Sequence, residues 1–340
     1  MSGSPKQARI TLAQVAEAAG VSIGTASNVL NGRPYVRQRV RDRVLQAAQE
    51  LGYRPNAIAE ALATGRHKML TLCAFFAENP IAAEIIQGAS SATQSAQYGL
   101  TICALGHGAS LQPSHIEAIL RQQAAAVVVF TYNEDPAPYL ELQSLGIPVV
   151  FINRRPSGID ADLIMVDARQ GTYDAVSHLL GRGRRRVALF TRSNNARPAL
   201  DRIAGYREAH ARMALGVPEG LIRTGLTNAD EAYRATEELL CLPQPPDAIF
   251  AGSATFTALG VLTCLQDHRV RIPADIAVIV AGDMKWVKLV EPPLTMVEED
   301  FEGLGRRAAE IALSRLDPRR VQESVREVQL AVQLVVRGSS

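Results

Sequence analysis

The sequence predicts an N-terminal all-α helix-turn-helix head with a hinge helix, followed by an α/β core of two doubly wound subdomains. Residues 10–52 repeat apolar side chains at helical spacing and place turn residues between the repeats. A short Ala-rich segment between Pro55 and Gly65 follows. From Lys68 onward, short apolar runs alternate with amphipathic segments, as buried parallel strands alternate with the helices that cover them.

The first two helices are predicted from apolar spacing and from two turn residues. Apolar side chains recur every three or four residues at Leu12, Val15, Ala16 and Ala19. Gly20 can adopt the left-handed conformation that ends a helix, and Ser22 can cap the next helix. The inward positions of that second helix are Ala26, Val29 and Leu30. Its outward positions carry short, non-acidic side chains that can approach the wall of a DNA groove: Ile23, Gly24, Thr25, Ser27 and Asn28.

The third helix adds positive charge to the head. Its apolar stripe consists of Val40, Val44, Ala47, Ala48 and Leu51. Arginines that can reach phosphates line its start: Arg37, Arg39, Arg41 and Arg43. Residues 1–68 hold ten Lys and Arg against four Asp and Glu, whereas the remainder holds 26 against 30. The positive charge therefore lies where nucleic acid would bind.

The segment after the third helix predicts a short helix that forms only on a partner. Pro55 prevents the third helix from continuing, and Asn56 is a good N-cap. The Ala-rich run ends at Thr64 and Gly65 after about two turns, which is too short for a stable isolated helix.

The core is predicted from the alternation of strand-like and helix-like segments. Buried parallel strands are expected at residues 69–76, 100–105, 125–130, 147–152, 187–190, 248–251 and 276–280. Helix-length segments such as residues 80–97 and 112–123 lie between them. Because the alternation repeats after Asp167, we expect two doubly wound subdomains.

The composition indicates a cytoplasmic protein without a metal or a cofactor. The chain has 340 residues, enough for two or three units. Its four cysteines lie in apolar runs without paired spacing, which favours reduced core residues over a disulfide or a metal site: Cys73, Cys103, Cys241 and Cys264. Residues 1–9 are polar and no apolar run approaches ~18 residues, so neither a signal peptide nor a membrane partner is expected.

An enzyme is the remote alternative for an α/β core, and its sequence motifs are missing. The chain has no Gly-x-Ser-x-Gly nucleophile elbow, no phosphate loop ending in Gly-Lys-Ser/Thr and no His-Glu-x-x-His. The glycines around His107 and Arg182 lack the rest of a dinucleotide fingerprint. The basic run at residues 182–186 is either a second nucleic-acid patch or, as we expect, a solvated loop.

The head closely resembles the LacI/GalR family of bacterial transcription regulators. The matching residues are Val15-Ala16, Ala19-Gly20-Val21-Ser22, Ser27, Val29-Leu30-Asn31-Gly32 and Leu51-Gly52-Tyr53-Arg54-Pro55-Asn56-Ala57. The resemblance continues through the core at lower density, at Asn79-Pro80, Gly146-Ile147-Pro148-Val149-Val150, Asp167, Gly171, Ala204-Gly205-Tyr206, Ala258-Leu259-Gly260, Pro273-Ala274-Asp275, Pro292-Pro293-Leu294-Thr295 and Leu304-Gly305. It implies a core similar to a periplasmic sugar-binding protein, whose two lobes close on a small molecule.

The resemblance also implies the domain boundaries. A disordered tail is expected at residues 1–9, the DNA-binding head at 10–52 and the hinge at 53–66. The core follows at 67–340, with an N-subdomain at about 67–155 and 297–322 and a C-subdomain at about 167–291 and 328–340. The crossovers between the subdomains are expected near residues 153–167, 292–297 and 322–328.

By the same resemblance, two chains form a homodimer on double-stranded DNA with a near-palindromic operator. Two hinge helices would pair in the minor groove, with Leu62 wedged into a base step, Ala59 at the helix contact and Asn56 at the helix start. The alternative for Leu62 is ordinary packing on the core. The expected DNA contacts are Ser22, Ile23, Gly24, Thr25, Ser27, Asn28, Asn31, Tyr35, Val36, Arg37, Arg39, Asn56, Ala59 and Leu62.

Asn28 occupies a position where many family members have arginine. An asparagine pairs best with adenine N6 and N7, whereas an arginine fork takes guanine O6 and N7. Asn28 is therefore expected to favour adenine, and the alternative is a bond to a phosphate.

The resemblance implies a small polar effector between the lobes: a sugar, a sugar acid or a sugar phosphate. The expected contacts are Ala82, Tyr132, Asn153, Arg154, Arg197, Ser253, Asp283 and Trp286. Ile81 and Ala82 replace two aromatics of the family, which disfavours a plain hexose. Counting back from Ala204-Gly205 places the family's sugar-binding arginine on Leu200, so Arg197 is its expected replacement.

Several of these contacts have an alternative. Half-buried packing is equally consistent with Trp286, and a salt bridge at a crossover is equally consistent with Asn153 and Arg154. For the whole core, the alternative to effector binding is a scaffold for dimerisation or for a protein co-regulator. Neither the identity of the effector nor its effect on DNA binding follows from the sequence.

Overall fold

The computed structural model describes residues 10–30, 35–53, 68–75, 81–106, 111–131, 133–253, 255–282, 285–317, 319 and 324–340. It divides into two compact units, Met1–His67 and Lys68–Ser340. Six predicted site residues lie outside the described residues: Asn31, Asn56, Ala59, Leu62, Tyr132 and Asp283. Within the described part of the chain, no helix combines the length and the apolar character that crossing a membrane requires.

The first unit contains the three helices that the sequence predicts: α1 (Leu12–Ala18), α2 (Ile23–Leu30) and α3 (Gln38–Glu50). Gly20 has a φ of 62°, so the turn after α1 uses the left-handed conformation that glycine tolerates. The side chains of Val15, Ala26 and Val44, one from each helix, are fully buried against one another. The predicted apolar spacing therefore forms the core of this head.

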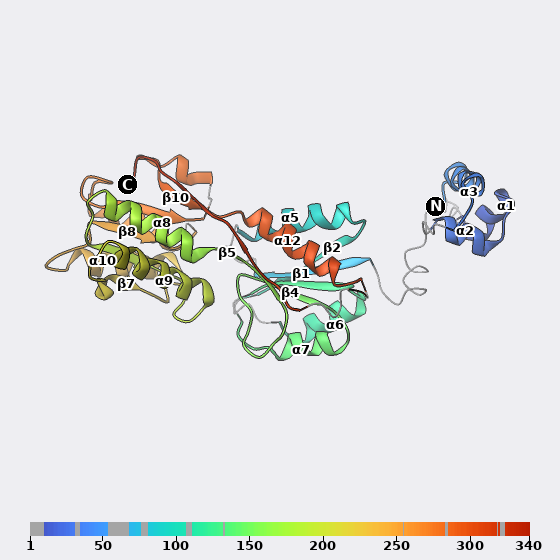
Figure 1. The fold of residues 1–340 in the computed structure, drawn as a ribbon, viewed down its shortest axis with the longest axis horizontal. Coiled ribbons are helices and arrows are strands. Elements are labelled where there is room, and N and C mark those ends of the chain that lie inside the picture. Colours follow the sequence, from blue (N-terminus) through green and yellow to red (C-terminus); the bar gives the residue numbers. More distant parts are fainter. Residues whose placement is uncertain are drawn as a thin grey trace, which may run out of the picture. The chain divides into compact units, whose positions relative to one another are not determined.

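The first lobe of the second unit is an all-parallel sheet in the order β11-β5-β4-β3-β1-β2. The strands are β1 (Met69–Phe75), β2 (Gly99–Leu105), β3 (Ala126–Phe130), β4 (Val149–Ile152), β5 (Asp162–Val166) and β11 (Glu327–Leu330). Helices α5 (Ile81–Ser95) and α12 (Phe301–Ser314) cover one face, and α6 (Pro113–Arg121) and α7 (Ala137–Ser144) cover the other. We call this the N-lobe (Figure 1).

The second lobe, the C-lobe, is a sheet in the order β12-β10-β9-β8-β6-β7, in which only β12 is antiparallel to its neighbour. Its strands are β6 (Val187–Phe190), β7 (Ile222–Arg223), β8 (Ala248–Ala251), β9 (Ala277–Ala281), β10 (Thr295–Glu298) and β12 (Gln333–Val335). Helices α8 (Ala168–Gly181) and α9 (Arg197–Arg212) pack on one face, and α10 (Ala229–Leu240) and α11 (Thr257–Asp267) pack on the other. The 3-10 turns η1 (Glu219–Leu221) and η2 (Lys285–Lys288) complete the lobe.

The chain passes between the lobes three times, a few residues later than the sequence indicated. Strand β5 lies inside the first expected crossover, so the chain leaves the N-lobe only at Asp167. Strand β10 belongs to the C-lobe sheet and overlaps the second expected crossover. The chain therefore crosses to the N-lobe only at Glu299 and Asp300. The third passage joins β11 to β12. Strands β5 and β10 lie next to the edge strands β11 and β12 and have only five and four residues, so their short apolar runs did not predict these boundaries.

Two helices on the N-lobe approach so closely that only glycine fits between them. Helices α5 and α12 lie side by side over the sheet (Figure 1). A Cβ atom added at Gly305 of α12 would lie 1.9 Å from the carbonyl oxygen of Ile85, and one at Gly88 of α5 would lie 1.8 Å from that of Glu302. Because the first turn of α12 follows the second passage between the lobes, this contact fixes where that passage enters the N-lobe.

The cysteines are all free, but they are not all core residues as predicted. Cys73 and Cys264 are buried, Cys103 is half-buried and Cys241 is exposed. Cys241 is the C-cap of α10. The apolar run that contains it extends beyond the buried face of the helix, so the cysteine lies at the surface.

Substituting Gly305 by Ala should destabilise the core by at least about 2 kcal/mol, because the added methyl group meets backbone atoms that cannot move independently. Gly181, at the end of α8, is the matched control, since a Cβ atom there meets nothing within 4 Å. Its substitution by Ala should be neutral or stabilising by up to about 1 kcal/mol. Urea unfolding measures both free energies, and equal effects would contradict the close contact.

Candidate functional site

Five of the predicted DNA contacts surround one hollow on the head. Its lining comes from α2, from the segment that leads into α3 and from the first turn of α3: Thr25, Asn28, Tyr35, Val36, Arg37 and Val40. Tyr35 is 91% exposed, so its ring is available to a partner. Ile23 is 55% exposed and lies on the same helix as Asn28. The structure thus places polar, aromatic and cationic side chains together, as groove and phosphate contacts require.

The start of α2 is fixed by the cap that the sequence predicted. The Ser22 hydroxyl accepts a hydrogen bond from the backbone N–H of Thr25 at 3.1 Å and pairs with the Thr25 hydroxyl at 2.8 Å. The cap satisfies a backbone donor that the first turn of a helix otherwise leaves unpaired. Ser22 therefore holds the N-terminus of α2 in place, next to the exposed Ile23 and Gly24.

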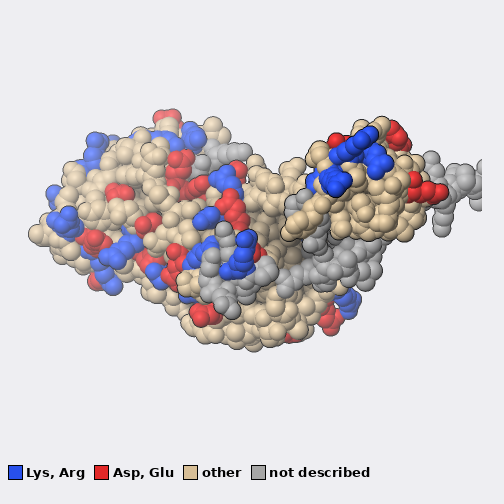
Figure 2. All heavy atoms as spheres, turned by 45° about the vertical axis from the view of Figure 1, so that its right-hand side comes forward, with Lys and Arg blue, Asp and Glu red and all other residues tan. Residues whose placement is uncertain are grey.

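Basic side chains gather along one side of the head in Figure 2. The described Lys and Arg residues of this unit are Arg37, Arg39, Arg41 and Arg43. Arg37 and Arg39 are exposed, and Arg43 extends towards the turn between α1 and α2, where its Nη1 atom would lie 3.9 Å from a Cβ at Gly20. The cationic side therefore spans more than one helix, which suits contact with successive phosphates.

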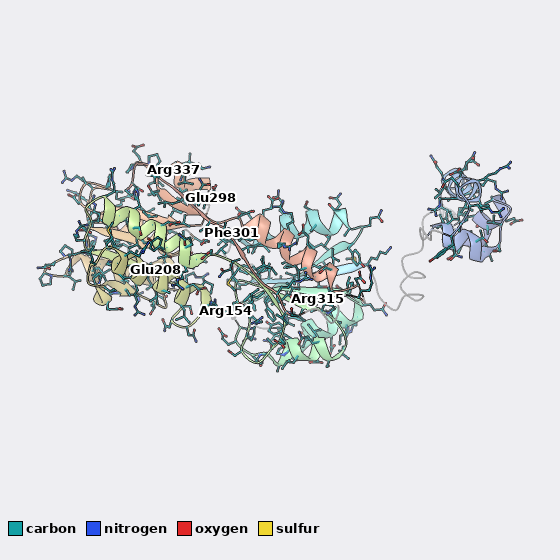
Figure 3. The ribbon with its side chains drawn as sticks, viewed as in Figure 1. Arg154, Glu208, Glu298, Phe301, Arg315 and Arg337 are labelled. Carbon is teal, nitrogen blue, oxygen red and sulfur yellow. The ribbon has the colours of Figure 1, made fainter. Side chains whose placement is uncertain are left out.

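A cavity of about 360 Å³ lies where the two lobes of the core meet. Its walls come from the carboxyl ends of strands in both sheets, where open α/β sheets bind ligands. The described lining residues are Ile81, Phe130, Thr131, Asn153, Arg154, Thr191, Arg192, Ser193, Ala196, Pro198, Ala199, Arg202, Thr227, Gly252, Ser253, Ala281, Glu299 and Phe301. Arg154 and Phe301 mark this junction in Figure 3.

Arg202 and Glu299 form an ion pair in the wall of this cavity. Arg202 extends from α9, and Glu299 lies at the second passage between the lobes, with Nη2 and Oε1 2.8 Å apart. Their side chains are only 12% and 5% exposed. Burial raises the pKa of the Glu299 carboxyl above its ordinary value, and the charge of Arg202 opposes that rise. Each partner therefore compensates the other's lost hydration.

Arg154 connects the two sides of the cavity. It follows β4 in the N-lobe, and its Nη2 atom donates to the Ser193 hydroxyl of the C-lobe at 3.4 Å. Its Nη1 atom lies 3.1 Å from the carboxylate of Glu134, which is half exposed. Asn153, just before it, has a φ of 62° and accepts a hydrogen bond from the backbone N–H of Val166 at 3.3 Å. Asparagine tolerates this left-handed backbone better than most residues, and the turn directs Arg154 into the cavity.

Arg192 supplies a third guanidinium group to the cavity. It follows β6, and its Cζ atom lies 4.1 Å from the centroid of the Phe256 ring. A cation–π contact of this kind holds the guanidinium in place without neutralising its charge.

Of the predicted effector contacts, the structure brings Asn153, Arg154 and Ser253 together in the cavity and places three others outside it. Ala82, in the first turn of α5, is fully buried, while the preceding Ile81 lines the cavity. Trp286 is half-buried and packs against the C-lobe core. Arg197 is turned outward, where its Nε atom pairs with Asp201 at 2.9 Å.

The helical phase of α9 explains why Arg202 lines the cavity whereas Arg197 and Leu200 do not. Pro198, Ala199 and Arg202 share the face that lines the cavity, since positions three and four apart lie on one side of a helix. Leu200 lies on another face and is 48% exposed. Arg202 is therefore the arginine of α9 that lines the cavity, whereas Leu200 and Arg197 do not.

Several lining residues were missed because they follow strands without forming a motif. Thr131, Thr191 and Arg192 come directly after β3 and β6, and this position after a buried parallel strand is the signal that could have found them. Glu299 follows β10, which lacks a long apolar run and was not predicted as a strand.

The basic run at residues 182–186 makes hydrogen bonds within the C-lobe. Arg184 donates to the carbonyl of Pro273, Arg185 to that of Leu180 at 2.7 Å, and Arg186 to that of Pro245 at 3.1 Å. Asp247 accepts the backbone N–H groups of Arg185 and Arg186. These guanidinium groups hold the turn before β6 against neighbouring loops.

A three-helix head with an exposed cationic side and a two-lobed core with a polar cavity define a ligand-binding regulator of DNA. Residues 11–56 match the family model of bacterial regulatory proteins of the lacI family, and residues 176–340 match a periplasmic binding protein-like domain. The chain therefore joins a helix-turn-helix domain of the lacI family to a periplasmic binding protein-like domain.

Curated relatives and solved structures extend this match over nearly the whole chain. The ribose operon repressor of Escherichia coli (strain K12) is 28% identical over 331 residues, 97% of this chain and 99% of that protein. The HTH-type transcriptional repressor PurR of Vibrio campbellii is 28% identical over 97% of this chain and 98% of that protein. A complex of the transcriptional regulator CelR with cellobiose has a TM-score of 0.71 at 28% identity, over 98% of this chain and 100% of that chain.

The lac repressor dimer bound to operator and to the anti-inducer ONPF shares the fold, with a TM-score of 0.77 at 23% identity, over 98% of this chain and 99% of that chain.

Replacing Arg202 by Leu should destabilise the core by roughly 3–5 kcal/mol at neutral pH, because Glu299 is then buried without its countercharge. Without Arg202 the pKa of Glu299 rises further, so the folded state binds a proton that the unfolded state releases. The loss should therefore grow as the pH rises through the folded-state pKa and shrink on acidification. Urea unfolding followed by the fluorescence of Trp286, the single tryptophan, measures it.

Arg197→Leu is the matched control, since it removes an ion pair whose arginine is 51% exposed and should cost no more than about 1 kcal/mol. Equal losses in the two variants, or a loss at Arg202 that does not change with pH, would contradict the buried pair.

Proposed function

We propose that this protein is a transcriptional repressor whose affinity for its operator is controlled by a small polar metabolite bound between the lobes of the core. The observation that supports this proposal most strongly is the cavity, which lies between the two lobes and is lined by side chains from each. The ribose operon repressor and PurR among the relatives support repression, and the CelR–cellobiose complex supports a small ligand. The protein would act in the cytoplasm, where a bacterial chromosome lies.

The head would bind double-stranded DNA as part of a homodimer. One α2 helix presents only a few base-reading positions, so two heads on a near-palindromic operator are needed for a specific site. Two protomers related by a two-fold axis would match the symmetry of such an operator. The dimeric lac repressor on its operator supports this arrangement by its fold.

The effector would act by changing the angle between the lobes. Arg154 and the Arg202–Glu299 pair connect elements on both sides of the cavity, so a bound ligand favours one relative position of the lobes. The N-lobe begins with β1 directly after the predicted hinge, and its movement would alter the spacing of the two hinge segments in a dimer. Effector and operator are then linked through one coupling free energy.

A core that serves only as a scaffold for dimerisation or for a protein co-regulator is the competing function. Thermal unfolding with a panel of sugars, sugar acids and sugar phosphates separates the two, because stabilisation by a true ligand grows as RT ln(1 + [L]/Kd). A concentration-dependent rise in the melting temperature of the core, together with altered DNA binding, is the expected result. A panel that shifts neither property favours the scaffold.

The protein should sediment as a dimer at micromolar concentration and protect one symmetric DNA site with two half-sites. The site is obtained by pull-down of genomic fragments with the full-length chain, and footprinting measures the protected sequence. A monomer that still protects a symmetric site would contradict the proposed assembly.

Asn28→Arg should change the base preference at one position of each half-site from adenine towards guanine, worth ~1–3 kcal/mol. The reason is that the arginine fork takes two guanine acceptors, whereas the shorter amide pairs with adenine. Selection from a randomised operator, carried out with both proteins, measures the change.

Gln46→Arg is the control for added charge, since Gln46 is exposed on α3 and lies outside the hollow that contains Asn28. It should strengthen binding without changing base preference. An unchanged preference in Asn28→Arg would assign Asn28 to contact with a phosphate.

A further inference from the structure

We propose that Cys73 and Cys103 form a redox-sensitive modification site, at which a hydroperoxide oxidises the two thiols to an intramolecular disulfide. Both cysteines lie in the N-lobe, on the neighbouring strands β1 and β2. Neither belongs to the described lining of the cavity between the lobes. The inference therefore does not rest on the proposed function.

The pairing of the two strands places the cysteines side by side. Strands β1 and β2 are parallel, and Cys73 is the register partner of Cys103. Adjacent strands lie about 4.7–4.9 Å apart, which falls within the roughly 4.4–6.8 Å range of Cα–Cα distances in disulfides. Register partners also point to the same face of a sheet, whereas a slip by one residue would move one of them to the opposite face. The observed register therefore satisfies the first requirement of a disulfide.

The packing of the two side chains confirms that they share one face of the sheet. Cys73 is fully buried in the core that α6 and α7 cover, and Cys103 packs against the same core. The thiols therefore lie together on one side of the sheet, and oxidation does not require either strand to turn over.

The two cysteines differ in their access to solvent. Strand β1 lies between β2 and β3, so Cys73 is enclosed on both sides. Strand β2 is the edge of the sheet, Cys103 is half-buried, and its neighbours Ile102 and Ala104 are exposed. A small hydroperoxide can therefore reach Cys103 without entering the core.

The two thiols also differ in acidity. A hydrogen bond with Cys73 lowers the pKa of the Cys103 thiol below its ordinary value, and burial opposes this effect. The neighbouring Cys103 and burial raise the pKa of the Cys73 thiol well above its ordinary value. Because the thiolate is the nucleophile, Cys103 is the thiol that attacks the oxidant and Cys73 is the thiol that then attacks Cys103.

The reaction takes two steps. The Cys103 thiolate first attacks one oxygen of hydrogen peroxide, so that an S–O bond forms, the O–O bond breaks and the departing hydroxide takes up a proton as water. The sulfur of Cys73 then attacks the sulfur of Cys103, so that an S–S bond forms, the S–O bond breaks and the hydroxide leaves with the Cys73 proton as a second water. The two thiols lose two electrons, and these reduce the peroxide.

Both thiols are free in the structure, which corresponds to the reduced form of the site. Reductants of a cytoplasm return an accessible disulfide to thiols, so the oxidised form would be transient. While it lasts, it links β1, the first strand after the predicted hinge, covalently to the edge of the N-lobe sheet.

The test uses the full-length protein with Cys241→Ser, because the exposed Cys241 would otherwise form disulfides between molecules. Hydrogen peroxide is added to this reduced parent protein, and a chromogenic thiol reagent counts the free thiols after denaturation. Peptide mapping without reduction identifies the linked pair. Cys103→Ser removes the attacking thiol, and Cys73→Ala removes its partner. Cys264→Ala is the matched control, since it removes the other buried cysteine, on α11 of the C-lobe.

In the parent protein, peroxide should remove the thiols of Cys73 and Cys103 as one linked pair, and dithiothreitol should restore both. Cys264 should keep its thiol, because burial raises its pKa to about 11. Thiol loss should slow by roughly tenfold or more in Cys103→Ser. Cys73→Ala should instead accumulate a sulfenic acid at Cys103, which dimedone traps. The Cys264→Ala control should form the link at the rate of the parent protein.

Other outcomes overturn the inference. A parent protein in which Cys103 stops at the sulfenic acid would show that the two sulfur atoms do not meet. Linkage that is as fast in urea as in the folded protein would show that the strand register does not prepare the pair. Unchanged thiol loss in Cys103→Ser would assign the reaction to another cysteine. Circular dichroism checks the folding of each variant, and Cys103→Ser, at the less buried position, decides the result if Cys73→Ala does not fold.

Discussion

The ion pair between Arg202 and Glu299 is the contact on which the arrangement around the cavity depends. It joins helix α9 of the C-lobe to the segment through which the chain returns to the N-lobe. Neither charge is tolerated alone at this depth, because burial removes the hydration of both groups. The pair therefore fixes the position of α9 relative to the second passage. The helix face that carries Arg202 becomes one wall of the cavity.

The parallel strands of the two sheets impose the second constraint, since strands that run in one direction end at the same edge. Residues that follow β3, β4, β6, β8 and β10 are far apart in the chain and converge at one place. Their side chains line the cavity rather than the hydrophobic cores of the lobes, so polar groups are tolerated there. This explains why Arg154, Arg192 and Ser253 meet although no motif connects them. A ligand in contact with both edges is sensitive to the angle between the lobes.

The head and the cavity use positive charge in different surroundings. Arg37 and Arg39 on the head are exposed, and in water their attraction to phosphates is long-ranged, sensitive to salt and indifferent to sequence. The cavity arginines are partly buried, so their charges act at short range and depend on geometry. The first arrangement favours association with any DNA, and we propose that base selection depends on neutral side chains such as Asn28.

The class of fold, the three helices of the head and most of the buried strands could be predicted from the sequence. These follow from local periodicity and from turn chemistry, such as the left-handed Gly20 and the Ser22 cap, which depend on neighbours along the chain. The sequence also allowed Asn153, Arg154 and Ser253 to be predicted as site residues, because each follows an apolar run that predicts a strand. Three features became visible only in the folded structure: the short strand β10, the orientation of Arg202 towards the cavity and the ion pair of Arg202 with Glu299. They depend on which helix face meets a distant segment, and that choice is made by packing across the lobes rather than by the local sequence.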